Sequence, residues 1–135
     1  MGDRTPKEWG RVAVELPGWR WMPGMLLINA DGPVRIDAVD GEVPGLLRRC
    51  RWTNEVYVAE VRCGPSPDPD DPGTGGCLLA LLGDDAHGVR RMNGAWVALL
   101  PVGDSGRFTW APRDSLGRAC IALAEAIGKW PGGAK

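Results

Sequence analysis

The chain has few of the side chains that usually carry out chemistry. It contains one histidine, His87, which excludes the common zinc sites built on two or three histidines. Its four cysteines are far apart and include no Cys-x-x-Cys pair, so they indicate reduced thiols and no structural zinc site. Ser105 lies in a Gly-Asp-Ser-Gly turn that does not complete the nucleophile motif of serine hydrolases. We therefore expect no catalytic residues, no metal, no cofactor and no enzymatic activity.

Membrane signals and a strong net charge are also lacking. No apolar stretch approaches the length of a membrane span, and the charged start of the sequence does not resemble a secretory signal. The formal net charge of −1 provides no general attraction for nucleic acid or for an anionic membrane. These absences predict a cytoplasmic protein without a membrane partner, and they argue against nucleic acid as the main partner.

Turn-forming residues are abundant, with 20 glycines and 12 prolines among 135 residues. The hydrophobic content of 44% is nevertheless that of a globular protein, and the length favours one domain over residues 1–135. The Pro- and Asp-rich segment Gly64–Gly73 is expected to be an exposed linker loop inside that domain. Its aspartates do not form a calcium-binding EF-hand loop, because Leu79 stands where that loop needs glutamate.

Two helices are indicated in the second half of the chain. Ser115 is the expected N-cap of the last one, in which an apolar stripe runs along Leu116–Ile127. Gly128 follows directly and is expected to end this helix. A shorter helix is expected over Cys77–Leu82, with Thr74 as its N-cap.

The N-terminal segment 5–16 fits two kinds of structure. Thr5-Pro6-Lys7-Glu8 matches a capping box with proline at the first helical position, which favours a helix. Val12, Val14 and Leu16 alternate with other residues, which also fits a strand. We prefer the helix because the cap is specific, but the sequence alone leaves both open.

The strand signals point to antiparallel pairing. Asn93-Gly94 between two apolar runs predicts a type I′ hairpin of Val89–Met92 and Ala95–Leu100. Further strands are expected at Leu26–Asn29, Val34–Val39, Val56–Val61 and Arg107–Trp110. Together these elements predict an α+β fold, with a mostly antiparallel sheet of about five strands packed by two or three helices.

Tryptophan and arginine supply the only candidate binding residues. Seven tryptophans accompany one tyrosine and one phenylalanine, which suits either large core anchors or a binding surface. In the hairpin register, Arg91 faces Trp96 and could form a cation–π pair. The candidates are Trp19, Trp21, Arg48, Arg49, Arg51, Trp52, Arg91 and Trp96. Whether the basic-aromatic cluster is a site or packing stays open at this point.

Two segments and the closing helix resemble a family of small phage and prophage proteins of uncharacterised function. The first is the Trp-Arg-Trp-Met-Pro-Gly-Met run at residues 19–25. The second, at residues 70–82, resembles the family's Asp-Pro-Ala-Thr-Leu-Gly-Cys-Leu-Leu-Ala-Leu helix, with Gly73 and Gly75 in place of Ala and Leu. The resemblance implies a phage-borne accessory gene expressed in a bacterial host cytoplasm, and it implies no catalytic residues.

Three functions are compatible with these features. The leading hypothesis is a non-enzymatic phage or prophage accessory protein that binds a host or defence-system protein through tryptophan and arginine anchors. The second is a small-molecule or nucleotide binder that stacks its ligand on tryptophan. The third is a protein that binds single-stranded nucleic acid through its arginines. The oligomeric state is open.

Overall fold

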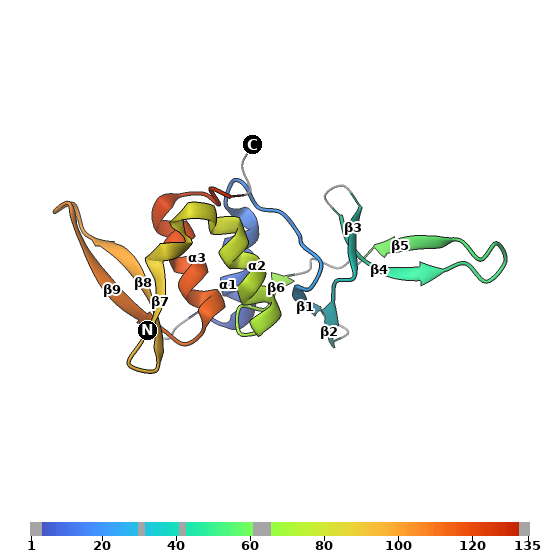
Figure 1. Ribbon diagram of the computed structural model, residues 1–135, viewed down its shortest axis with the longest axis horizontal. Helices are drawn as coiled ribbons and strands as arrows, with labels where there is room; N and C mark the ends of the chain where they lie inside the picture. The colour runs from blue at the N-terminus through green and yellow to red at the C-terminus, as the bar shows by residue number, and fades with distance from the viewer. Residues whose placement is uncertain (1–3, 30–31, 41–42, 61–65, 133–135) are drawn as a thin grey trace.

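The computed structural model describes residues 4–29, 32–40, 43–60 and 66–132 and has an α+β architecture, as expected. The helices gather in a central body with one sheet on one side, and a two-stranded hairpin projects on the other side (Figure 1). The described strands form three separate antiparallel sheets of three strands each, so the prediction of one sheet of about five strands is wrong. In the second and third sheets, strands that follow one another in the chain pair with each other, whereas in the first sheet β6 joins β1 from a distant part of the sequence.

The elements follow in chain order. The helices are α1 (Pro6–Glu15), α2 (Pro72–Leu82) and α3 (Leu116–Ile127), with a 3-10 helix, η1 (Gly83–Gly88), directly after α2. The first sheet consists of β1 (Leu26–Asn29), β2 (Gly32–Arg35) and β6 (Ser66–Pro67). The second consists of β3 (Ala38–Asp40), β4 (Val43–Arg49) and β5 (Val56–Glu60). The third consists of β7 (Val89–Met92), β8 (Ala95–Val102) and β9 (Arg107–Arg113).

The N-terminal segment is a helix, as the capping pattern favoured. Thr5 Oγ1 accepts a hydrogen bond from the backbone N–H of Glu8 at 3.2 Å, and Pro6 occupies the first turn. Trp9 and Ala13 are buried on the inner side of α1. Val12, Val14 and Leu16 are each partly buried, so the alternation that resembled a strand does not mark one covered face.

Helix α2 begins earlier than expected, and its cap was misassigned. Asp71 is the N-cap, because its carboxylate accepts a hydrogen bond from the backbone N–H of Thr74 at 2.9 Å. Thr74 is fully buried inside the helix, where its Oγ1 accepts a hydrogen bond from the backbone N–H of Leu26 at 2.9 Å. The hydroxyl therefore connects α2 to β1 instead of starting the helix.

Segment Gly64–Gly73 is not an exposed linker over the residues that the structure describes, which begin at 66. Ser66–Pro67 forms β6 and pairs with β1, and Pro69 is also buried. The segment lies tightly against α3, because a Cβ at Gly117 would collide with the carbonyl of Pro69. A proline-rich segment can therefore pack partly into a core as well as lie exposed.

The expected strand Val34–Val39 is divided between two sheets. Its first part belongs to β2 and pairs with β1, whereas its end belongs to β3 and pairs with β4. Ile36, at the break, is 2% exposed and belongs to the buried core. The change of partner strand carries the chain from the body to the projecting hairpin.

The turn between β7 and β8 and the last helix, α3, agree with the sequence patterns. Asn93 and Gly94 both have positive φ, 51° and 81°, as a type I′ turn requires. Ser115 caps α3 by accepting a hydrogen bond from the backbone N–H of Arg118 at 3.2 Å. Gly128 ends α3 in the left-handed conformation with φ 95°.

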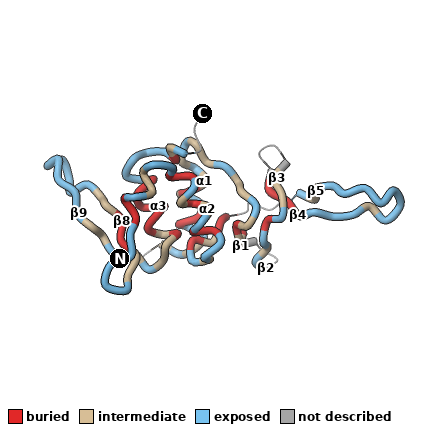
Figure 2. Tube along the Cα trace, in the orientation of Figure 1, coloured by how far each residue is buried: buried red, intermediate tan, exposed pale blue. Residues whose placement is uncertain are grey.

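The core lies where α2, α3, β8 and the segment before β1 meet, and buried chain is concentrated there (Figure 2). Trp130 is fully buried, and its indole N–H donates to the carbonyl of Ala13 at 2.9 Å. The residues after α3 are thereby fixed onto α1. Among the described helices, none combines the length and hydropathy needed to span a bilayer.

Candidate functional site

The eight predicted site residues do not form one site. Four of them lie on the projecting hairpin, two lie in the connector between α1 and β1, and two lie on β7 and β8. The hairpin group is Arg48, Arg49, Arg51 and Trp52, the connector group is Trp19 and Trp21, and the last group is Arg91 and Trp96. Each place has its own geometry.

We define the arm as residues 46–60, which comprise the outer part of β4, its turn and β5. In the register of the arm, Leu47 faces Val58 and Arg49 faces Val56, so these four side chains share one face. Arg48 and Tyr57 are partners on the opposite face. Most of the arm is exposed on both faces (Figure 2).

Large apolar side chains are unusually exposed along the arm. The exposed fractions are 49% for Leu47, 87% for Trp52, 55% for Val56 and 51% for Tyr57. Only Trp52 was a candidate from sequence. The other three were missed because β-branched and aromatic residues at 56–61 indicated only a strand, and a strand pattern does not show that both faces lack a covering layer in the described structure.

The turn of the arm is well defined by hydrogen bonds. Arg49 Nη1 donates to the backbone carbonyl and side-chain oxygen of Asn54 at 3.1 and 3.2 Å, so this arginine braces the turn. Asn54 itself has a positive φ of 63°. A hydrogen bond from the Thr53 side chain, followed by backbone hydrogen bonds from Thr53 and Trp52, lowers the pKa of the Cys50 thiol.

Two arginines of the arm have no such role. Arg48 and Arg51 are exposed, and no described residue forms a hydrogen bond or ion pair with either guanidinium. Arg51 precedes Trp52 in the sequence, and Arg48 is the register partner of Tyr57. The arm thus presents aromatic and aliphatic surface next to two unpaired positive charges.

Arg91 and Trp96 form the cross-strand pair that the hairpin pattern predicted. They are register partners, and the Arg91 guanidinium lies 5.7 Å from the indole ring centroid. A second pair on the same sheet, Arg90 over Trp110 at 5.3 Å, was not foreseen because it depends on the pairing of β8 with β9. Both pairs pack the surface of one sheet.

Trp19 and Trp21 lie beside a cavity of about 780 Å³. Their rings meet edge to face, with centroids 5.2 Å apart and planes at 87°. Trp19 also contacts the buried Trp130, with a centroid distance of 5.8 Å. The indole N–H of Trp19 is shielded from solvent, and no acceptor for it lies among the described residues.

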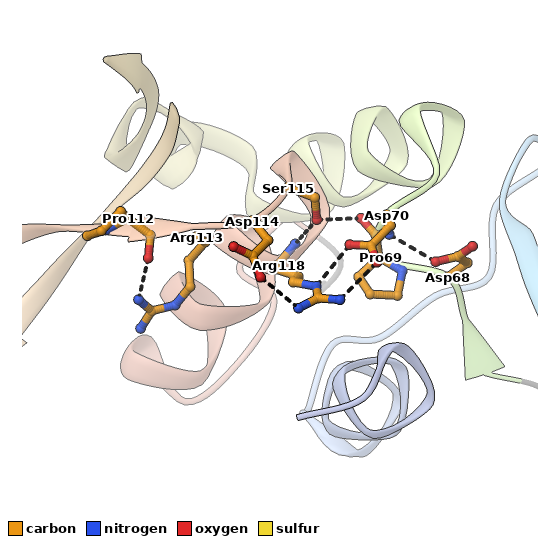
Figure 3. Close-up of polar contacts among 8 residues, drawn as sticks. All are labelled: Asp68, Pro69, Asp70, Pro112, Arg113, Asp114, Ser115 and Arg118. Carbon is orange, nitrogen blue, oxygen red and sulfur yellow. Dashed lines mark hydrogen bonds and ion pairs between the residues drawn. The ribbon is translucent and has the colours of Figure 1, made fainter. Parts of the chain in front are cut away.

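The acidic cluster at residues 68–71 serves the fold. Arg118 donates to both oxygens of Asp70 at 2.9 Å and to Asp114 at 3.2 Å (Figure 3). Burial alone would raise the pKa of Asp70, but hydrogen bonds from Arg118 and Ser115 lower it overall. The Asp71 carboxylate accepts a bidentate pair of hydrogen bonds from the Arg35 guanidinium, and this interaction is the main reason why the pKa of Asp71 is lowered.

The single histidine is on the surface. His87 is exposed at the end of η1, and its Nδ1 contacts the backbone carbonyl oxygen of Asp84. Within the described ranges, no three or more His, Cys, Asp or Glu side chains are grouped so as to hold a metal ion.

Comparison with protein-family models, curated proteins and solved structures found no significant match to this chain. The geometry of the arm and of the tryptophan-lined cavity is therefore the basis for assigning function. These two features lie on different segments of the chain.

Proposed function

We propose that this protein is a non-enzymatic phage or prophage accessory protein that binds a host protein through the arm. The observation that carries the proposal is the position of its exposed apolar surface. Four of the eight strongly exposed large hydrophobic side chains among the described residues belong to the arm. Large apolar side chains that gather in water on one short hairpin mark an interaction site, because leaving them exposed is unfavourable.

The composition of the arm matches that of an interface centre. Tryptophan, tyrosine and arginine are the residues that most often dominate binding energy in protein interfaces. Trp52 and Tyr57 supply the aromatic anchors, while Arg48 and Arg51 supply unpaired charges at the edge. The complementary partner surface is apolar at its centre and carries carboxylates at its rim.

A protein partner fits the arm better than nucleic acid does. A two-stranded ribbon has the width to enter a major groove, but groove binding relies on polar and basic side chains. One face of the arm instead presents Leu47, Val56 and Val58, and Arg49 is already occupied by Asn54. Glu55, exposed at the turn, would also repel phosphate.

The proposal is tested by capture from bacterial host lysate with matched variants. The arm variant Trp52→Thr/Tyr57→Thr removes two anchors from exposed positions. The control variant Val102→Thr/Phe108→Thr removes two exposed side chains, 47% and 63% accessible, from the β8–β9 hairpin. Truncating two anchors is expected to weaken capture by roughly 30-fold or more, on the basis of about 2 kcal/mol for one hot-spot residue.

The proposal is supported if the wild type and the control variant capture the same partner and the arm variant does not. All three proteins should have equal melting temperatures, which shows that the arm variant is folded. Equal capture by the arm variant contradicts the proposal. A complex whose affinity falls steeply with salt and contains nucleic acid replaces it with the nucleic-acid alternative. If sedimentation shows a dimer of the wild type that the arm variant does not form, the arm is a self-association surface instead.

A further inference from the structure

The cavity beside Trp19 and Trp21 is a second feature that the arm does not explain. It is formed by the end of α1, the connector that leads to β1, and β3, and its volume is about 780 Å³. The connector runs between the helical body and β3 in Figure 1. Small-molecule sites commonly occupy about 300–1,000 Å³, so the cavity has the size of a ligand site.

Most of the described residues that line the cavity have apolar or aromatic side chains. Leu16, Met22 and Val39 contribute aliphatic and thioether surface, and Trp19 and Trp21 contribute two indole rings. The fully buried Trp130 contacts Trp19 from the core side, and this contact fixes the position of that ring. The aromatic wall is therefore preformed, which reduces the entropy that a ligand would lose on binding.

The Arg20 side chain supplies the charge at the cavity. Among the described residues that line the cavity, Arg20 is the only charged one, and none of the described residues bonds or pairs with its guanidinium. Because Arg20 is exposed, water satisfies its N–H donors in the free protein, and a ligand with acceptor oxygens can replace that water.

We propose that this cavity binds a small apolar monoanion, namely an aromatic or aliphatic carboxylate. The apolar body of the ligand would contact the indole rings and Met22, and its carboxylate would meet the Arg20 guanidinium, whose planar fork matches two oxygens. The charge at the cavity decides against a nucleotide. A nucleoside triphosphate carries several negative charges, and the described lining of the cavity offers one positive side chain.

The test compares two probes that differ in charge and hardly in shape, 2-naphthoate and 2-naphthamide, by isothermal titration calorimetry. The carboxylate is expected to bind about tenfold more tightly, because a charge-assisted bond is stronger than a neutral one. Arg20→Gln should abolish that preference without affecting folding, since Arg20 is exposed. The matched control, Arg107→Gln at the exposed β8–β9 turn, should keep it.

Trp21→Leu should weaken both probes alike while the difference between them persists. Equal affinities of the two probes for the wild type, or a preference that survives Arg20→Gln, would overturn the proposal. Absence of binding by 2-naphthoate and by octanoate up to their solubility limits would also overturn it. The arm variant Trp52→Thr/Tyr57→Thr should bind 2-naphthoate as the wild type does, which separates this inference from the proposed protein interaction.

Discussion

The helical body and the arm use the same residue type in opposite ways. Trp130 in the body is 0% exposed and bonds to α1, whereas Trp52 at the end of the arm is 87% exposed. Burying a large aromatic side chain is a major source of folding free energy, so Trp130 contributes to stability and Trp52 does not. Apolar burial, and the folding free energy that comes from it, is therefore concentrated in the body, whereas the arm leaves apolar surface in water.

Thiol chemistry should show the largest difference between the two regions. Burial raises the pKa of Cys120 to about 12, whereas hydrogen bonds at the turn lower the pKa of Cys50. We expect iodoacetamide at pH 8 to alkylate Cys50 at least about a thousandfold faster, because the thiolate is the reacting species. Peptide mass spectrometry in a Cys63→Ser background measures both rates. Comparable rates in native buffer would mean that the core around Cys120 opens readily.

Removing each of the two tryptophans measures the difference in stability. Trp130→Ala should lower the free energy of unfolding by about 3–5 kcal/mol, because it leaves a cavity and removes the hydrogen bond to Ala13. Trp52→Ala should change the free energy of unfolding by less than about 0.5 kcal/mol. Urea titrations followed by circular dichroism give both values. A large loss for Trp52→Ala would show that the arm packs onto something within the folded chain.

Acid should weaken the body through Asp71, which joins α2 to β2 by its bond with Arg35. The folded-state pKa of Asp71 is lowered, so its contribution is present above the unfolded pKa near 4 and is lost as pH falls through the lower folded value. Asp71→Asn keeps a capping oxygen but removes the charge.

We expect this variant to be about 1 kcal/mol less stable at pH 7 and to show a flatter loss of stability from pH 4 downwards. Thermal melts across this pH range provide the measurement. The control is Glu55→Gln on the arm, because no described residue forms a hydrogen bond or ion pair with the Glu55 carboxylate. If both variants follow the wild-type pH curve, the Asp71–Arg35 bond does not contribute to stability.

The smallest effect is expected for the exposed pair of Arg91 and Trp96. Arg91→Gln should cost about 0.5 kcal/mol, the range of a solvent-exposed cation–π contact. It should leave partner capture by the arm unchanged, because the pair lies on a different sheet. Chemical denaturation measures the free energy of unfolding of this variant, with Arg107→Gln as the control. Loss of partner capture by Arg91→Gln would extend the binding surface beyond the arm.

The predictions that the structure confirms rest on residues that lie close together in the sequence. The Thr5 and Ser115 caps, the Asn93-Gly94 turn and the Arg91–Trp96 pair each involve residues only a few positions apart. Thr74 was misassigned because two capping residues, Asp71 and Thr74, both precede the apolar run. The choice between them depended on Leu26, which is distant in sequence and bonds the Thr74 hydroxyl.

The candidate sites were predicted only in part. Trp19, Trp21 and Trp52 were singled out, but Leu47, Val56 and Tyr57 were not, because alternation along a strand does not show whether another layer covers it. Trp19 and Trp21 were considered for stacking, but the cavity beside them depends on Val39 of β3. The single domain over residues 1–135, the phage family and the cytoplasmic location stay predictions.

Local residue patterns were enough to predict the α+β class, the caps of α1 and α3 and the turn between β7 and β8, since these depend on hydrogen bonds and backbone preferences within a few residues. The tertiary structure alone decided that the sheet is divided into three, that Ser66–Pro67 is buried, and which tryptophans face water. Burial depends on segments that meet only after folding, as Trp130 meets Ala13 across the length of the chain. No local pattern contains that information.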